Sequence, residues 1–273
     1  MSDTPSARPA LDAPRLSGHG PELGPDVAVE VVALAPSSQA LVADRARAGA
    51  PDGLVVVVEE QTAGRGRLDR TWETPSGAGL TFSLLLRPTS PAAAWPWLPL
   101  LTGYAVTKAL RVRGVDAGVK WPNDVLVEDR KVAGILAERV DTPQGPAAVV
   151  GIGLNVSQAA DELPVPTATS LDLEVPGPAP ADRTEVLVEV LSAVREAYDA
   201  WEAGGEPGLR RLQESYAAAC TTVGRRVRVD LPGGETLEGD AVGVDESGRL
   251  LVETGDGPRA VSAGDVVHVR PAG

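Results

Sequence analysis

The chain is poor in cysteine, histidine and aromatic residues, and each scarcity excludes a class of structure. A single cysteine, Cys220, rules out a disulfide within the chain and fits a reducing compartment. A zinc cluster is excluded too, because Cys220, His19 and His268 are too few and too scattered. Aromatic residues make up only 3% of the chain, so the core has to be built mainly from Val, Leu and Ala.

Long apolar runs are absent as well. No stretch approaches the roughly 20 apolar residues that a membrane-spanning helix needs. Residues 1–25 lack the charged and then apolar pattern of a secretion signal. Together with the lone cysteine, these absences lead us to expect a cytoplasmic protein.

Positive charge is the next deficit. The formal net charge is −13, from 25 basic and 38 acidic residues. A surface of this sign repels nucleic acid, so a DNA-binding function would need a local basic module, and no segment supplies one. Local groups of Lys or Arg are correspondingly informative.

The 273 residues suit one substantial domain followed by a small one. Residues 1–25 are rich in Pro, Gly, Ser and Ala and are predicted to form a disordered, flexible tail. Residues 26–221 alternate short strands with helices, and residues 222–273 consist of short β-runs separated by glycine turns. The predicted fold class is α+β, with a mixed β-sheet domain flanked by helices and then a small SH3-like β-barrel.

Hydrophobic periodicity places the main elements. Ser37 and Ser38 are expected to cap a helix that ends at Gly49, and Asp182 with Glu185 is similar to a capping box that opens another helix. A further helix is expected over 207–219. Strands are predicted at 27–33, 54–58, 80–86, 132–140 and 147–152, and a helix at 95–112.

The most informative loop runs from Gln61 through Gly-Arg-Gly-Arg to Arg70 and Trp72. Glycines on both sides of Arg65 let the backbone approach a ligand closely, and arginine forks suit phosphate and carboxylate oxygens. A flexible loop with solvated arginines is the alternative for this segment taken alone. The loop is not a Walker motif, since Gly-x-x-x-x-Gly-Lys-Ser/Thr is absent.

Lysine is rare, and two of the three lysines fall in one short stretch. Lys120 opens Lys-Trp-Pro-Asn-Asp, and Lys131 opens Lys-Val-Ala-Gly-Ile-Leu-Ala-Glu, whereas Lys108 lies apart. In a chain that otherwise prefers Arg, a retained Lys indicates that a compact ammonium is needed. The alternative for Lys-Trp-Pro-Asn-Asp is a plain β-turn, and the alternative for the Lys131 motif is an edge strand with a solvated lysine.

The last motif is Gly-Ile-Gly-Leu-Asn over 151–155. Its glycines could let a flat ring approach the backbone, although an ordinary turn at a strand end has the same composition.

The order and spacing of these motifs, with a small β-barrel after them, resemble those of the biotin–protein ligase family, of the monofunctional type without an N-terminal DNA-binding domain. The resemblance covers residues 27–270. It implies an enzyme that uses ATP to convert biotin into biotinyl-5′-AMP, with AMP and pyrophosphate as products. Biotin then passes to a lysine of a biotin carboxyl carrier domain of an acyl-CoA carboxylase.

The resemblance also implies roles for individual residues. The residues expected to act in catalysis are Lys131, Arg65 and Arg67. Those expected to bind biotin are Ser37, Ser38, Gln39, Gln61, Gly64, Arg65, Gly66, Arg67, Lys131 and Gly134. Those expected to bind ATP or the adenylate are Arg67, Arg70, Trp72, Lys120, Asn123, Asp124 and Asn155.

The resemblance also bears on the metal ion, and this sequence departs from the family pattern in two places. Mg²⁺ is expected to be held mainly by ATP, with Asp124 as a candidate ligand. Ser38 and Gln39 differ from the family's Ser-Thr-Asn, and Asp69 stands where glycine is frequent.

Two rival functions follow from related proteins. A lipoate–protein ligase-like enzyme is disfavoured by the Gly-Arg-Gly-Arg loop and by Lys-Trp-Pro-Asn-Asp. A biotin-responsive repressor is disfavoured because residues 1–25 are too few for a helix-turn-helix module. The protein is expected to be a monomer or a weak homodimer that binds neither nucleic acid nor membrane.

Overall fold

The computed structural model describes residues 8–16, 23, 26–177 and 181–269. The chain divides into two compact units, each made of separate segments. The first contains residues 1–87 and 130–192, and the second contains residues 88–129 and 193–273. This division differs from the predicted boundary between 26–221 and 222–273, because residues 88–129 group with the C-terminal strands.

The first unit is built on a mixed sheet in which the strands follow the order β1-β2-β3-β7-β6. Strands β1 and β2 pair in parallel, and the remaining pairs are antiparallel. The mixed sheet predicted from the sequence is confirmed. Its strands are β1 (Ala28–Ala35), β2 (Leu54–Gln61), β3 (Gly79–Leu86), β6 (Arg130–Thr142) and β7 (Gly145–Asn155).

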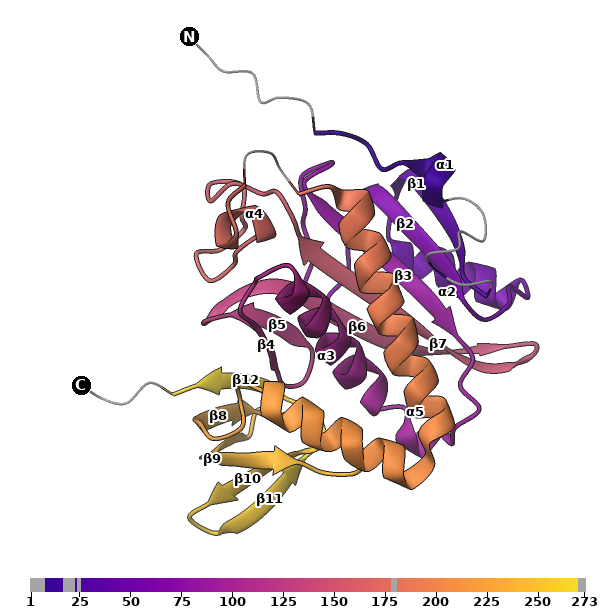
Figure 1. The fold of residues 1–273 in the computed structure, drawn as a ribbon. Helices are drawn as coiled ribbons and strands as arrows, with labels where there is room; N and C mark the ends of the chain where they lie inside the picture. Colours follow the sequence, from indigo (N-terminus) through magenta and orange to yellow (C-terminus); the bar gives the residue numbers. More distant parts are fainter. Residues whose placement is uncertain (1–7, 17–22, 24–25, 178–180, 270–273) are drawn as a thin grey trace. The chain divides into compact units, whose positions relative to one another are not determined.

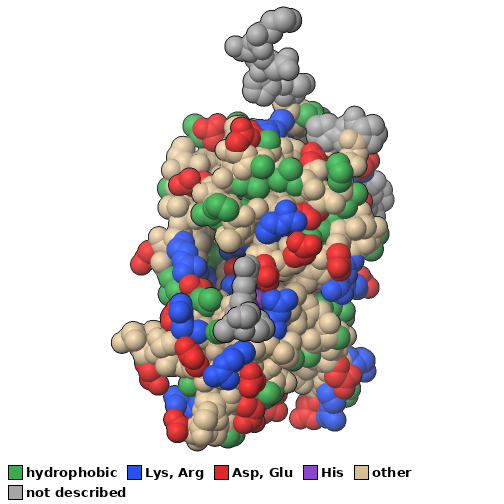
Figure 2. Space-filling view, turned by 90° about the vertical axis from the view of Figure 1, so that its left-hand side faces the viewer, with side chains coloured by type: hydrophobic (Ala, Val, Ile, Leu, Met, Phe, Trp, Pro, Cys, Tyr) green, Lys and Arg blue, Asp and Glu red, His purple; other side chains and the backbone are tan. Residues whose placement is uncertain are grey.

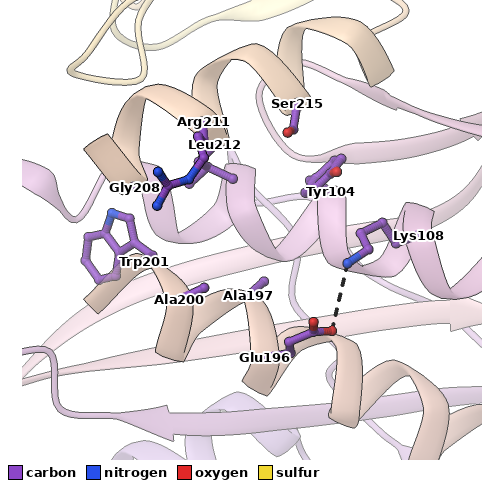
Figure 3. Close-up of a pocket in the computed structure, with 10 residues that line it drawn as sticks. All are labelled: Tyr104, Lys108, Glu196, Ala197, Ala200, Trp201, Gly208, Arg211, Leu212 and Ser215. Carbon is purple, nitrogen blue, oxygen red and sulfur yellow. Dashed lines mark ion pairs between the residues drawn. The ribbon is translucent and has the colours of Figure 1, made fainter. Parts of the chain in front are cut away.

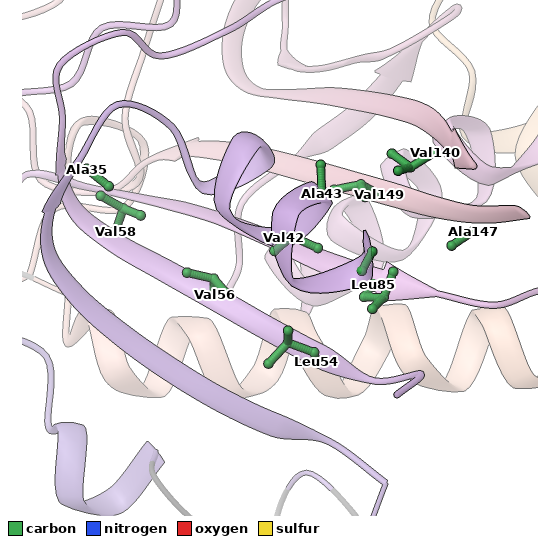
Figure 4. Close-up of a cluster of buried hydrophobic side chains, with 11 residues drawn as sticks. Ala35, Val42, Ala43, Leu54, Val56, Val58, Leu85, Val140, Ala147 and Val149 are labelled. Atoms are coloured by element: carbon green, nitrogen blue, oxygen red, sulfur yellow. The ribbon is translucent and has the colours of Figure 1, made fainter. Parts of the chain in front are cut away.

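Helix α2 (Ser38–Arg47) covers one face of this sheet (Figure 1). Val42 and Ala46 are fully buried there, against Val56 of β2 and Val149 of β7 (Figure 4). Each valine buried in this way contributes about 1.5–3 kcal/mol relative to an exposed one. Because helix and sheet meet through aliphatic side chains alone, the core needs no aromatic residue at this point.

The segment 8–16 differs from the predicted tail. It ends in a short helix, α1 (Ala13–Leu16), and its Leu16 is only 1% exposed. The backbone N–H of Leu11 donates to Glu59 at 2.8 Å, and the Asp12 N–H donates to Thr184 at 3.0 Å. These contacts attach the segment to the first unit. The rest of the predicted tail, apart from residue 23, lies outside the described residues before position 26.

The second unit combines helix α3 (Trp97–Val112) with a hairpin of β4 (Ala117–Lys120) and β5 (Asp124–Val127). It also holds a five-stranded antiparallel sheet in the order β11-β10-β9-β8-β12. The C-terminal β-domain is therefore confirmed, while its closure into an SH3-like barrel stays a prediction. Its strands are β8 (Arg226–Asp230), β9 (Thr236–Val244), β10 (Leu250–Thr254), β11 (Gly257–Val261) and β12 (Asp265–His268).

Helix α5 (Arg183–Ala219) begins in the first unit and continues in the second, and it is broken at Gly205, where φ is 52°. Asp182 caps its start, since its Oδ1 accepts the Thr184 N–H at 2.8 Å, as the sequence predicted. The two helices expected here are thus present as two arms of one kinked element. The structure adds two short elements that were not predicted, α4 (Leu171–Glu174) and a 3₁₀ turn η1 (Ala92–Ala94).

Acidic and basic side chains are interspersed over the face shown in Figure 2. Among the described residues, no helix is long and apolar enough to cross a membrane.

Candidate functional site

The site lies on the same sheet face that α2 covers, next to the N-terminal end of that helix. Under α2 this face carries aliphatic residues such as Leu85 and Val149. Two residues further along the same strands, the face carries Ser83 and Gly151, which lie opposite each other in the β3–β7 pairing. Since residues two apart in a strand share a face, the core continues directly into a polar, glycine-lined surface.

A buried polar cluster forms where α2 begins. Ser83 Oγ donates to Gln39 Oε1 at 3.1 Å and lies 2.9 Å from Ser38 Oγ. The Gln39 amide donates to the carbonyl oxygens of Val149 at 3.0 Å and Leu136 at 3.3 Å. Because its oxygen and both of its protons have partners within the protein, Gln39 orients Ser83 directly and Ser38 through Ser83.

Gln61, at the end of β2, caps α2. Its Oε1 accepts the Ser38 backbone N–H at 2.7 Å, whereas the side chain of Ser37 makes no capping bond. The predicted capping by the serine side chains is therefore wrong, and Gln61 satisfies the first N–H of the helix instead. A Cβ at Gly64 would overlap the Trp72 carbonyl oxygen and lie 3.0 Å from Gln61 Nε2. Glycine is required at 64 for the chain to turn this closely over Gln61.

The Gly-Arg-Gly-Arg segment forms a tight hairpin. Trp72 N–H donates to the Gly64 carbonyl at 3.1 Å, and Gly66 N–H donates to the Arg70 carbonyl at 2.7 Å. At its tip, Leu68 and Asp69 both have positive φ, of 55° and 56°. Two consecutive residues of this kind form the turn that Asn-Gly usually fills, which explains why glycine suits the position of Asp69.

Arg65 is held at the base of this hairpin by a carboxylate of β6. Its two terminal nitrogens donate to Glu138 at 2.9 and 2.6 Å, a bidentate pair that is partly exposed. Arg67 lies at the first position of the turn and Arg70 at its last, with Arg70 N–H donating to the Arg67 carbonyl at 3.2 Å. The three arginines therefore occupy one compact hairpin.

The indole of Trp72 lies on the backbone of β7 and β6. A Cβ at Gly153 would overlap the indole, and one at Gly134 would come within 3.0 Å of the ring. Gly134 and Gly153 face each other in the β6–β7 pairing. At Gly153, one of the two glycines where the sequence allowed a flat ring to approach, that ring is a side chain of the protein itself.

Lys131 joins the same surface. Its Nζ lies 5.5 Å from the centroid of the Trp72 ring, within the range of a cation–π contact. Its backbone is fixed on the other side, since Lys131 N–H donates to Thr167 at 2.7 Å and its carbonyl accepts from Thr169 at 2.9 Å. Three motifs far apart in the sequence meet at this point.

Asn155, at the end of β7, is engaged within the protein. Its amide donates to the Thr169 carbonyl at 2.9 Å, and its oxygen accepts from Gln158 at 2.9 Å. The side chain is only 4% exposed. Two contacts within the first unit therefore orient this amide.

The remaining predicted residues, Lys120, Asn123 and Asp124, belong to the second unit. They lie in and beside the turn that joins β4 to β5. Within the described part of the chain, no three His, Cys, Asp or Glu side chains are grouped so that they could hold a metal ion.

A pocket of about 180 Å³ lies elsewhere in the second unit, between α3 and the two arms of α5 (Figure 3). Trp201, Tyr104 and Leu212 line it, and Lys108 pairs with Glu196 at its edge at 3.8 Å. None of the residues predicted to act in the site lines this pocket.

Sequence reasoning missed three residues that shape the site. Ser83 is fully buried in a strand whose other inward positions are mostly aliphatic, and a polar residue in such a strand was the available signal. Thr74 accepts a hydrogen bond from Trp72 Nε1 at 2.9 Å, and Glu138 holds Arg65. Glu138 ends the Lys131 motif, although no role was predicted for it, and Thr74 carried no signal in the sequence.

Comparisons with known proteins match both parts of the chain. Residues 32–156 match the biotin/lipoate A/B protein ligase family, and residues 222–269 match the biotin protein ligase C terminal domain. The chain is 38% identical to the biotin–[acetyl-CoA-carboxylase] ligase of Mycobacterium tuberculosis, over 99% of this chain and 100% of that protein. It is 34% identical to the bifunctional ligase/repressor BirA of Bacillus subtilis, over 84% of this chain and 70% of that protein.

A solved structure agrees with these sequence matches. The biotin protein ligase from Aquifex aeolicus in complex with biotin and ATP superposes with a TM-score of 0.75 at 29% identity. The alignment covers 89% of this chain and 98% of that one.

Proposed function

Since the chain belongs to the biotin protein ligase family, we propose that it is an ATP-dependent enzyme that joins biotin to a lysine of a carrier protein. The meeting of Trp72, Lys131 and the arginine hairpin on one glycine-lined surface carries this proposal. A flat ring, a fixed ammonium and guanidinium groups suit a substrate that combines an adenine with phosphate and carboxylate groups.

Biotin would bind at the start of α2. The buried hydroxyl groups of Ser38 and Ser83 offer hydrogen bonds for a polar head group, and Gln39 fixes Ser83, which in turn contacts Ser38. Gln61 closes this end, and its Nε2 makes no hydrogen bond to another described residue. Ser37, Gly66 and Gly134 complete the proposed pocket through the backbone and small side chains around it.

In the first step, a carboxylate oxygen of biotin attacks the α-phosphorus of ATP, and the bond to the β-phosphate breaks to release pyrophosphate. Two anions have to approach each other, so cations placed beforehand lower the barrier, each by about 3–4 kcal/mol. Lys131 would supply this charge, and Arg67 would hold the phosphate of the finished adenylate. Trp72 would cover the adenine, with Arg70, Lys120 and Asn155 as further contacts of the nucleotide.

In the second step, a neutral lysine amine of the carrier attacks the acyl carbon of the adenylate. The bond from that carbon to the phosphate oxygen breaks, AMP leaves, and the new amide loses one proton. Until then, water has to be kept from the mixed anhydride. The hairpin of Arg65 and Arg67 would close over the adenylate, which requires Arg65 to leave Glu138 or to move with it.

Mg²⁺ would come to the site with ATP. Because the described residues hold no group of three metal-binding side chains, most of its ligands would be phosphate oxygens and water, with Asn123 and Asp124 as candidate contacts. When bound, the ion would neutralise part of the negative charge on the leaving pyrophosphate.

The test is ATP-dependent transfer of labelled biotin to the apo form of a biotin carboxyl carrier domain of an acyl-CoA carboxylase. A carrier whose acceptor lysine is replaced by arginine is the control. Transfer of lipoate with no transfer of biotin would favour the rival ligase function, and absence of both would refute the proposal.

A further inference from the structure

Residues just before the C-terminal strands of the second unit are bonded to the backbone on both sides of Lys120. Thr221 N–H donates to the Val119 carbonyl at 2.7 Å, just before the lysine. The Trp121 N–H donates to Thr222 Oγ1 at 3.2 Å, just after it. One short segment, between α5 and β8, thus brackets Lys120.

The Trp121 side chain strengthens this attachment. It is only 1% exposed, and its Nε1 donates to the Gly248 carbonyl, in the turn before β10, at 3.0 Å. With the backbone fixed on both sides, only the side-chain torsions of Lys120 remain free.

Thr222 is itself held by a chain of polar contacts. The Arg225 guanidinium, which can only donate, lies 3.2 Å from His268 Nδ1, so this nitrogen is the acceptor. The proton of a neutral imidazole then lies on Nε2, which donates to Thr222 Oγ1 at 3.2 Å. Arg225 also donates to Asp129 at 2.9 Å, which anchors the other end of the chain.

The electrostatics agree with a neutral His268. Burial, followed by the charges of Lys120 and Arg225, lowers the pKa of His268 to about 4. At neutral pH, His268 therefore stays neutral, so that its Nδ1 accepts from Arg225 and its Nε2 donates to Thr222.

We propose that Thr222 and His268 are positioning residues for Lys120, through which the C-terminal sheet orders the Lys-Trp-Pro-Asn-Asp turn for binding of the nucleoside triphosphate. The inference rests on the proposed function. Neither residue has to touch the substrate, because both act through the Trp121 peptide. Loss of the Thr222 hydroxyl would leave a buried N–H without an acceptor, and the turn would relax to satisfy it.

The test compares two pairs of variants. Thr222→Val and His268→Leu remove the hydrogen bonds. Thr222→Ser retains the hydroxyl, and His268→Gln supplies an amide donor in place of Nε2. We expect the first two to raise the KM for ATP about tenfold, with kcat within about twofold and the KM for biotin unchanged. The conservative variants should stay close to wild type. Thr236→Val, which removes an exposed hydroxyl of β9, is the control.

An unchanged KM for ATP in folded Thr222→Val and His268→Leu would overturn the inference, and so would equal increases in the KM for both substrates. Calorimetric titration with a non-hydrolysable ATP analogue applies the same comparison without turnover. Absence of biotin-dependent pyrophosphate release by the wild type would refute the proposed function instead, and the calorimetric comparison would still decide the role of Thr222 and His268.

Discussion

At the scale of single residues, the site depends on where a few charges are held. Lys131 has its backbone fixed by Thr167 and Thr169, and its ammonium lies over the Trp72 ring. Arg65 has a carboxylate partner in Glu138. Fixed cations of this kind stabilise developing negative charge without reorganisation during the reaction.

Replacement of Lys131 by alanine should lower the rate of adenylate formation at least about tenfold, which corresponds to about 1.4 kcal/mol in the barrier. The measurement is biotin-dependent pyrophosphate release. Lys108→Ala removes a half-exposed lysine that lies outside the site, and it should leave the rate unchanged. A Lys131→Ala enzyme as fast as wild type would show that the ammonium takes no part in the chemical step.

Arg67→Ala should separate the making of the intermediate from its retention. The hairpin tip would cover the finished adenylate, and loss of one charge-assisted hydrogen bond costs about 1.5–3 kcal/mol. We expect adenylate to form but to escape about 10- to 100-fold faster. The measurement is biotin labelling of serum albumin alongside adenylate release in a chase experiment.

Arg139→Ala, which removes an exposed arginine of β6, is the control for this experiment. Failure of Arg67→Ala to make any adenylate would place Arg67 in the chemical step instead.

At the scale of elements, the glycines of β6 and β7 decide where the hairpin rests. Gly134 and Gly153 form a flat surface that Trp72 covers, and Gly64 lets the hairpin begin close to Gln61. Because a strand is rigid, this surface fixes the indole and, through it, the base of the hairpin.

Gly153→Ala should displace the Trp72 indole, since the added methyl group would overlap the ring. We expect the KM for ATP to rise about tenfold, equivalent to about 1.4 kcal/mol. Gly243→Ala is the matched control, because a methyl group there meets open space in β9. A Gly153→Ala enzyme with an unchanged KM for ATP would mean that Trp72 does not contact the nucleotide.

Periodicity predicted most of these elements correctly, because their buried faces are continuous. The face of α5 is an example, where Leu187, Leu191 and Val194 repeat at helical spacing and are all buried. The attached segment 8–16 could not be predicted, because its Leu11 and Leu16 stand among prolines without a period.

The candidate site was partly predictable for a related reason. The order of the motifs along the chain predicted that the arginine hairpin, Lys131 and the glycines of β7 belong to one site. The engagement of Gln39 and Asn155 depends on partners from other strands and loops, such as Ser83 and Thr169, that no local pattern reveals.

At the scale of the whole molecule, acid should weaken the fold through His268. Its pKa is about 4 in the folded protein against an ordinary 6.5, so the unfolded chain binds more protons between these values. Stability is therefore full above pH 6.5 and falls as the pH drops toward 4, by an amount on the order of 3 kcal/mol.

The measurement is the free energy of unfolding by urea at pH 7, 5.5 and 4.5. His268→Gln, which cannot titrate, should show a shallower loss than wild type over this range. Equal slopes for the two proteins would contradict a buried neutral histidine.

The division into two discontinuous units also has a consequence for synthesis of the chain. The partners of Trp121 lie 101 residues later at Thr222 and 127 residues later at Gly248. At about 5–20 residues per second, the ribosome needs roughly 5–25 s to deliver them after the tryptophan has been made. During this interval the indole and the turn beside it have no C-terminal strands to pack against. The indole of Trp121 thus stays without these partners until residues 222–248 have been made.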